Sequence, residues 1–521
     1  MSAEALLPAK ATVAITPPIP MAWVAALVAL LALLLLAALH VGFQASDDAN
    51  YLTGALGWIE HFPYVGDSHW TLRHTITLPT ALLVQLLGMN EFSVSLSNML
   101  YFLALLALNA VFCLRYLGKG SALVTSLLLI TMPGFLVVAT YLNPDIPEVF
   151  FVSAAFWFWR SALDDPARTG RWLACGLFLG LAFVNRETSA ALILFIGLLY
   201  LFHPLAPRSR YLFVAAAFVL VVGADWLFLT VSTGNPLYRL SVDFHHGVVD
   251  RTANVGEVAA RGGLIDKEGN ISVNVFVDPL LNLFISQKYT LLFWLLIPAG
   301  LHAFARHRQP QLLTIGLLAG FGVVSFLFVG ANPKLYLVPR YFVVVAWVAS
   351  IIVGWWLASC WVSGRRVLAG SLLACSLLAN GIALSVENIN PRFVEKELVT
   401  WVATHPGEPI YTDIETYDRA SYYFRFADVP MDRVSTDRPP AGRHFFYSAE
   451  RVAECATTPR CRARVSDYRP SPSWQIEQTI EKPKRALGKL AHGIGMDSVL
   501  PTDIRQRVVG SGVAVTIYSV K

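Results

Sequence analysis

The sequence predicts a polytopic α-helical membrane protein with a small soluble α/β domain at its C-terminal end. Two observations support this fold class: the share of charged residues and an abrupt change of composition near residue 390. Hydrophobic residues make up 55% of the 521 positions and charged residues only 14%, against roughly 25% charged in an average soluble domain. That composition excludes a cytosolic enzyme, a disordered protein and a fibrous one. The net charge of +5 is too small and scattered to indicate nucleic-acid binding.

The change of composition near residue 390 separates an apolar part from a polar C-terminal part. Residues 390–521 carry 35 of the 75 charged residues, which is the density of a soluble domain. Within this part, 394–404 has helical spacing, 409–412 and 444–447 are strand-like, and 421–426 is rich in aromatic residues. We therefore expect a cytoplasmic tail at 1–20, a transmembrane domain at 21–389 and a soluble domain at 390–521.

Apolar runs close to the roughly 20 residues that span a bilayer recur through the first part. Met21–Leu39 has no charge and is too long for the core of a cleaved signal peptide, so we expect a retained helix. About eleven membrane helices are predicted, at 21–43, 92–116, 121–141, 147–163, 172–186, 188–203, 211–232, 289–306, 311–330, 339–362 and 367–387.

The loops predict which way the helices run. With the N-terminus in the cytoplasm, every even-numbered helix ends in a short loop rich in basic residues, as the positive-inside rule requires. These loops hold Arg115/Lys119, Arg160/Arg168/Arg171, Arg208/Arg210, Arg306/Arg308 and Arg365/Arg366. The soluble domain then faces the periplasm or its equivalent, where Cys455 and Cys461 either form a disulfide or stay free. We expect a multi-pass protein of the inner (plasma) membrane.

The first outer loop, 44–91, holds two adjacent carboxylates, Asp47 and Asp48, directly after the first membrane helix. Segments 51–62 and 76–87 have helical spacing but are too short to span, so we expect helices lying along the membrane surface. Arg73 and His74 stand just before the second of them. A purely structural explanation is that the two aspartates cap the first surface helix.

Three further polar groups fall on the same side of the membrane. Asn143-Pro144-Asp145 and Glu148 open the fourth helix, although the same residues suit a capped turn. Arg186 and Glu187 interrupt a long apolar stretch, either as an internal ion pair or as part of a site. Lys334 and Arg340 run against the positive-inside trend and need an anionic partner, either a phosphate or a carboxylate such as Asp145.

Together these motifs resemble the GT-C glycosyltransferases of the family 39/83 branch, which contains protein O-mannosyltransferases and the aminoarabinose and RgtA-like transferases. The resemblance covers roughly residues 20–345. It rests on Ser-Asp-Asp-Ala-Asn-Tyr joined to Asn143-Pro144-Asp145 and on the late Arg340-Tyr341-Phe342. It departs at the pair, where many relatives have Asp-Glu, and at Arg73-His74-Thr75, where many have a Lys-Pro-Pro-like stretch.

The resemblance implies transfer of a sugar from a polyprenyl-phosphate carrier to an acceptor hydroxyl on the outer membrane face, with inversion. The acceptor is a lipid, a glycan or a protein. Asp47, with Asp48 able to exchange roles, matches the catalytic base, and Asp145 matches the second acid of the site. The donor phosphate is assigned to Arg340, Lys334 and Arg73. Substrate contacts are expected from Tyr51, His74, Glu148, Arg186, Glu187 and Tyr341.

Several points stay open at this stage. No cofactor is fixed by the sequence, although Asp47, Asp145 and Glu148 offer a hard oxygen site for a divalent ion. The long outer loop, 233–288, is either a lid over the site or an inert connector. A polytopic transporter or lipid flippase, with Asp225 as its membrane acid, and an O-antigen-ligase-like transferase are the alternative functions.

Overall fold

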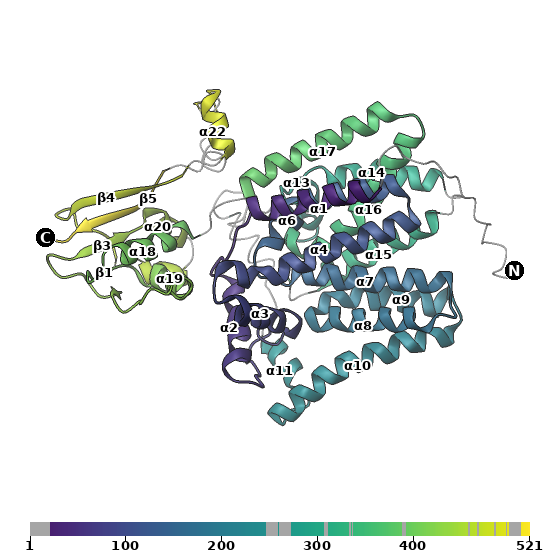
Figure 1. Ribbon diagram of the computed structural model, residues 1–521, viewed down its shortest axis with the longest axis horizontal. Helices are drawn as coiled ribbons and strands as arrows, with labels where there is room; N and C mark the ends of the chain where they lie inside the picture. The colour runs from purple at the N-terminus through teal and green to yellow at the C-terminus, as the bar shows by residue number, and fades with distance from the viewer. Residues whose placement is uncertain are drawn as a thin grey trace.

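The computed structural model describes the chain at residues 21–245, 259, 272–306, 311–332, 335, 337–387, 392–456, 459–465, 468–483, 486–495, 498–499 and 512–521. Lys334 and most of the long outer loop lie outside these residues, so what was predicted for them is not addressed by the structure. Figure 1 shows a bundle of long helices on one side and a smaller unit containing a β-sheet on the other.

The bundle is built from apolar helices that run along a shared direction (Figure 1). Its elements are α1 (Met21–Ala38), α4 (Glu91–Tyr116), α5 (Lys119–Thr131), α6 (Pro133–Leu136), η2 (Val138–Thr140), α7 (Asp145–Asp164), α8 (Thr169–Asn185), η3 (Glu187–Ser189), α9 (Ala190–Phe202), α10 (Arg208–Thr233), α11 (Tyr238–His245), α13 (Asp278–Ile285), α14 (Leu292–Ala305), α15 (Leu312–Ala331), η4 (Pro339–Phe342), α16 (Val343–Val362) and α17 (Arg366–Glu387). The polytopic helical architecture is thus confirmed.

The length and composition of the helices bear on the number of membrane crossings. Among the described residues, five helices are long and apolar enough to cross a bilayer, or six when the pair bent by 69° at Met132 is taken as one broken span. The remaining predicted spans fall on helices that are shorter or carry more charge, such as α8 and α9. The figure of about eleven therefore stays a prediction.

The centre of the bundle is α16, because 89% of its most apolar window is buried, against 11% for α10. Buried hydrogen bonds to one asparagine side chain fix the position of α16 relative to its neighbours. The indole nitrogens of Trp157 on α7 and Trp347 on α16 both donate to Asn109 Oδ1 on α4, at 3.1 and 2.9 Å. One amide thereby satisfies two buried donors, and three helices are tied together without an unpaired polar group.

Two short helices, α2 (Asp47–Glu60) and α3 (His74–Leu87), lie at the end of the bundle that faces the sheet-containing unit (Figure 1). They correspond to the two surface helices predicted from spacing, and each begins a few residues earlier than expected. The loops between α4 and α5, α7 and α8, and α16 and α17 lie at the opposite end. There Asp164 pairs with Arg115 at 3.0 Å and Arg160 at 2.6 Å.

The C-terminal unit is a small α/β fold, as predicted. Its five strands have the order β2-β1-β3-β5-β4, with β1 parallel to β2 and β3, and β5 antiparallel to β3 and β4. The aromatic segment 421–426 belongs to a helix, α19. The elements are α18 (Phe393–Thr404), β1 (Ile410–Tyr411), α19 (Ile414–Phe426), β2 (Val434–Ser435), β3 (His444–Tyr447), α20 (Ala449–Ala456), α21 (Pro459–Val465), β4 (Gln475–Lys482), α22 (Ala486–Gly493) and β5 (Gly512–Ser519).

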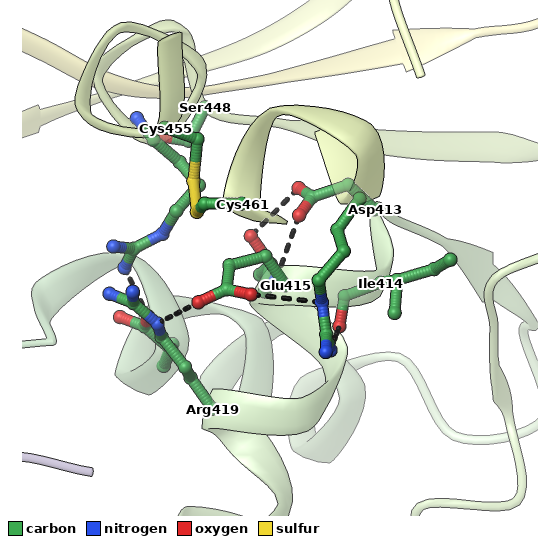
Figure 2. Close-up of a disulfide and its surroundings, with 11 residues drawn as sticks. Asp413, Ile414, Glu415, Arg419, Ser448, Cys455 and Cys461 are labelled. Atoms are coloured by element: carbon green, nitrogen blue, oxygen red, sulfur yellow. Dashed lines mark hydrogen bonds and ion pairs between the residues drawn. A yellow bond between two sulfur atoms is a disulfide. The ribbon is translucent and has the colours of Figure 1, made fainter. Parts of the chain in front are cut away.

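A disulfide between Cys455 and Cys461 joins α20 to α21 (Figure 2). It brings Arg464 of α21 to Glu415 of α19, with 3.0 Å between the guanidinium Nε and a carboxylate oxygen. Glu415 also accepts a hydrogen bond from Arg419 at 2.6 Å. The disulfide and these ion pairs hold the helical hairpin against α19, the helix that faces the first outer loop.

Candidate active site

A tight turn leads from the end of the first membrane helix into α2 and carries both aspartates. The buried Asp48 turns back to accept three backbone N–H groups, from Gln44 at 2.5 Å, Ser46 at 2.7 Å and Ala49 at 3.1 Å. Burial raises the pKa of Asp48 to about 6, while these hydrogen bonds act in the opposite direction. Asp48 therefore closes the turn and has no face left for a substrate.

Asp47 points elsewhere and stays accessible. Its carboxylate lies 3.3 Å from a guanidinium nitrogen of Arg340, and the two side chains are 39% and 41% exposed. Arg340 belongs to η4, the short turn that precedes the central helix α16. The pair joins the first outer loop to the core of the bundle and places an accessible carboxylate beside an accessible guanidinium.

Behind this pair lies a buried cluster around Arg186. Its Nη1 contacts Asp145 at 2.5 Å and Glu148 at 3.0 Å, and all three side chains are at most 6% exposed. Thr188 donates a hydrogen bond to the other carboxylate oxygen of Glu148. In this cluster two buried carboxyl groups share one guanidinium.

Local sequence explains why these residues meet. Asn143 Oδ1 accepts the N–H of Asp145 at 2.9 Å and so caps the start of α7. At the end of α8, the Asn185 side chain donates to the Pro144 carbonyl at 3.0 Å and accepts from Thr75 at 3.1 Å. The two asparagine side chains thus connect the turn before Asp145, the turn that carries Arg186 and the start of α3.

Two tyrosines complete the site. The guanidinium groups of Arg186 and Arg340 both lie close to the ring of Tyr341, at 4.6 and 5.1 Å from its centroid. Arg340 also donates to the Tyr341 hydroxyl at 3.2 Å. Tyr51, buried on α2, accepts a hydrogen bond from Arg73, and burial raises its pKa to about 12. The Tyr341 ring attracts both cations without neutralising either.

A second ionic cluster adjoins the first. His74 Nδ1 lies 2.9 Å from Asp225 of α10, whose other oxygen accepts from Arg239 of α11 at 2.8 Å. Glu187 is 3.9 Å from Arg239. His74 and Glu187, both predicted to contact substrate, therefore lie in this neighbouring cluster, and Asp225 is held at the loop end of α10 by an ion pair.

The described residues do not form the predicted metal site. Asp145 and Glu148 converge on Arg186, whereas Asp47 pairs with Arg340. Among the described part of the chain, no group of three or more His, Cys, Asp or Glu side chains is placed to hold a metal ion. The guanidinium of Arg186 lies between the two acids, and a divalent ion at this site stays a prediction.

A cavity of about 10 Å³ lies beside Glu148, Thr188 and Ser325, and it has room for about one water molecule. The hydroxyl of Ser325 has no hydrogen-bond partner in the part of the chain that the structure describes. The volume is far too small for a sugar. The accessible region around Asp47 and Arg340 is consequently the better candidate for the reacting groups.

Sequence reasoning brought together most of this site but missed several members. Thr188, next to Glu187, was not singled out, and Arg239 falls within the long outer loop. Arg392 and Tyr423 of the C-terminal unit also reach the first outer loop, as described below. The signal for Arg239 was its cationic charge on the outward side, which is the same signal that singled out Arg340.

Comparisons with known proteins bear on the fold of the chain. The family model described as Dolichyl-phosphate-mannose-protein mannosyltransferase matches residues 76–228. The structure resembles ArnT from Cupriavidus metallidurans bound to undecaprenyl phosphate, with a TM-score of 0.57, 14% identity, and coverage of 88% of this chain and 97% of that chain. It also resembles the oligosaccharyltransferase of Archaeoglobus fulgidus in complex with Zn and sulfate (TM-score 0.50, 13% identity, 80% and 58% covered). The sequence comparison with curated proteins finds no match. The chain thus shares the GT-C-like membrane fold that its sequence predicts.

Proposed function

We propose that this protein transfers a sugar from a polyprenyl-phosphate carrier to an acceptor hydroxyl at the outer membrane boundary. The observation that carries the proposal is the accessible Asp47–Arg340 pair at the bundle end, 3.3 Å apart. A proton acceptor and a phosphate-binding cation are the two groups that this reaction needs. The fold of ArnT, solved with undecaprenyl phosphate bound, supports the same substrate class.

The two residues divide the reaction between them. A lipid phosphate entering the site takes the guanidinium of Arg340, which binds phosphate oxygens in a fork and leaves Asp47 without its partner. Asp47 then accepts the proton of the acceptor hydroxyl as its oxygen bonds to the anomeric carbon. The bond from that carbon to the phosphate oxygen breaks, and the electron pair leaves on the lipid phosphate, beside Arg340. Attack opposite to the leaving group inverts the anomeric centre.

The buried cluster supports both groups. Asp145 and Glu148 fix Arg186, and Arg186 holds the Tyr341 ring against Arg340. This arrangement keeps Arg340 oriented while its partner changes from carboxylate to phosphate. Arg73, engaged with the Tyr51 hydroxyl on the other side, is a second cation for the donor phosphate or for the sugar.

The proposed location follows from the same features. The basic loops lie at the bundle end away from α2 and α3, and the positive-inside bias places them in the cytoplasm. The Cys455–Cys461 disulfide is typical of an oxidising compartment, so the C-terminal unit faces outward together with Asp47. The protein is then a multi-pass enzyme of the inner membrane whose N-terminus is cytoplasmic.

The test is turnover of a radiolabelled polyprenyl-phosphate sugar by the purified full-length protein in lipid nanodiscs. Asp47→Asn should lower kcat by about 10²–10⁴-fold, the usual contribution of a general base. Arg340→Gln should weaken donor binding and also lower kcat, because the guanidinium stabilises the charge that develops on the departing phosphate. Asp165→Asn, at the opposite end of the bundle, is the matched control and should turn over normally. Wild-type turnover by Asp47→Asn rules out the assignment. Movement of lipid across the bilayer without a glycosylated product favours the flippase alternative.

A further inference from the structure

The turn before Asp47 is held through its backbone, and half of the contacts come from far along the chain. Phe43 N–H donates to Glu91 at 3.1 Å and Gln44 N–H to Asp48 at 2.5 Å. The two carbonyls are bound by the C-terminal unit: the Tyr423 hydroxyl donates to Phe43 O, and Arg392 Nε donates to Gln44 O. Both peptide groups at the entrance of the turn are therefore fully satisfied.

The same turn contains a strained backbone conformation that is stable only with support from its surroundings. Ala45 has a φ of +47°, in the left-handed region that residues with a Cβ rarely adopt. Such conformations persist only where the surroundings over-determine them. Two of the surrounding contacts, those from Arg392 and Tyr423, are more than three hundred residues away in sequence, so neither exists unless the C-terminal unit is docked.

Apolar side chains of the C-terminal unit also pack directly against the first outer loop, which carries Asp47. The Phe43 ring is surrounded by three aromatic rings of α19, with centroid distances of 5.2 Å to Tyr422, 5.6 Å to Tyr423 and 5.2 Å to Phe426. Buried residues of α2, including Tyr51, belong to one hydrophobic core with α18, α19 and the sheet. Lys396 of α18 adds an ion pair to Glu91 at 2.9 Å. The C-terminal unit shares a core with the first outer loop.

We propose that the C-terminal unit sets the catalytic geometry, with Tyr423 and Arg392 as positioning residues that hold the 43–48 turn and thereby aim Asp47. This inference rests on the proposed role of Asp47. The unit contributes no group to the bond-making step. Its contribution is to keep the strained turn in the one conformation in which Asp48 faces inward and Asp47 faces Arg340.

Neighbouring tyrosines provide a matched test in the full-length protein. Tyr423→Phe keeps the ring against Phe43 and removes only the donor to its carbonyl. Tyr422→Phe is the control, because the Tyr422 hydroxyl lies 2.7 Å from the side chain of Thr53 on α2 and does not contact the turn backbone. Tyr423→Phe should lower kcat by about tenfold or more, since a misplacement near 1 Å is enough for such losses. The KM for the lipid donor and the thermal unfolding midpoint should stay near their native values, as in Tyr422→Phe.

Arg392 and amide exchange supply independent readouts. Arg392→Gln should lower kcat in the same way, and Arg392→Lys, which keeps a cationic donor, should recover part of it. Hydrogen exchange at residues 44–49 should be faster in Tyr423→Phe and unchanged in Tyr422→Phe. Native kcat and native exchange in both Tyr423→Phe and Arg392→Gln overturn the inference, while a dead Asp47→Asn leaves the proposed function standing. An active Asp47→Asn removes the base assignment and, with it, this inference.

Discussion

Arg186 is the residue whose removal the structure makes most costly. Its guanidinium contacts Asp145 at 2.5 Å and Glu148 at 3.0 Å, and the cluster is almost fully buried. Arg186→Met keeps a long apolar side chain against the Tyr341 ring but removes the positive charge. Two acids then remain side by side and almost fully buried, where an ionised carboxylate is strongly disfavoured.

Removing one partner of a buried ion pair costs about 3–5 kcal/mol, because it leaves an uncompensated charge. That is a large fraction of the roughly 5–15 kcal/mol by which proteins are stable. A variant that also neutralises the acids, Arg186→Met with Asp145→Asn and Glu148→Gln, has no charge left to compensate and should recover most of the loss. Thr188 can still donate to the amide oxygen of a glutamine at 148.

The assay is reversible unfolding of the purified protein in mixed micelles, followed by tryptophan fluorescence. Arg168→Met is the control, since its ion pair with Asp165 lies at the surface, where such a pair contributes about 0–1 kcal/mol. A single Arg186→Met variant within about 1 kcal/mol of wild type would refute the reasoning. A triple variant no more stable than the single one would also refute it, because the loss would then come from packing and not from unpaired charge.

Three further outcomes follow from other contacts. The pKa of Asp48 is about 6 in the folded protein and near 3.9 in the unfolded chain. The free energy of unfolding should therefore fall by up to roughly 3 kcal/mol as the pH rises from about 4 to about 6. Unfolding measured at pH 4, 5 and 6 should show this decrease in the wild type and not in Asp48→Asn. Replacing Cys455 and Cys461 by serine should destabilise the C-terminal unit by about 2 kcal/mol, as chain-entropy loss for so short a loop predicts, measured by proteolysis of the unit under native conditions. Asp225→Ala should cost about 3 kcal/mol by leaving Arg239 buried without its main partner, and adding Arg239→Met should restore most of it in the same unfolding assay.

Much of the fold was predictable from composition and from the spacing of apolar residues. Apolar length, basic loops and the change at residue 390 predicted the bundle and the soluble unit, and helical spacing predicted the two short helices. The break between α5 and η2 was not predicted, because an apolar run looks the same whether the helix within it is straight or bent by 69°. Segment 421–426 showed only that it was aromatic. Its helical conformation and its contact with Phe43 depend on packing between parts of the chain nearly four hundred residues apart.

The sequence indicated which charged residues lie near the candidate site, but it did not indicate which of them form ion pairs with one another. Charge on the outward side singled out Asp47, Asp145, Arg186 and Arg340, since burying such groups near a membrane is costly without a function or a partner. Which acid meets which base is a matter of geometry. The sequence offered a phosphate or a carboxylate such as Asp145 as the partner of Arg340, and in the structure the carboxylate beside Arg340 is that of Asp47. It offered an internal pair of Arg186 with Glu187, and the ion pairs of Arg186 run to Asp145 and Glu148.

The two members of the acidic pair lie in different surroundings, because Asp48 is bound within its own turn whereas Asp47 is accessible beside Arg340. Consecutive side chains on a helix point about 100° apart, so Asp47 and Asp48 cannot both face the same partner. Asp48 takes the structural task by binding three backbone N–H groups of its own turn. That leaves Asp47 directed away from the turn and toward Arg340. An adjacent acidic pair at a helix start is therefore a way to aim one carboxylate by fixing the other. The identity of the second residue matters less than its ability to accept backbone hydrogen bonds, which a glutamate at 48 would have to do with one more rotatable bond.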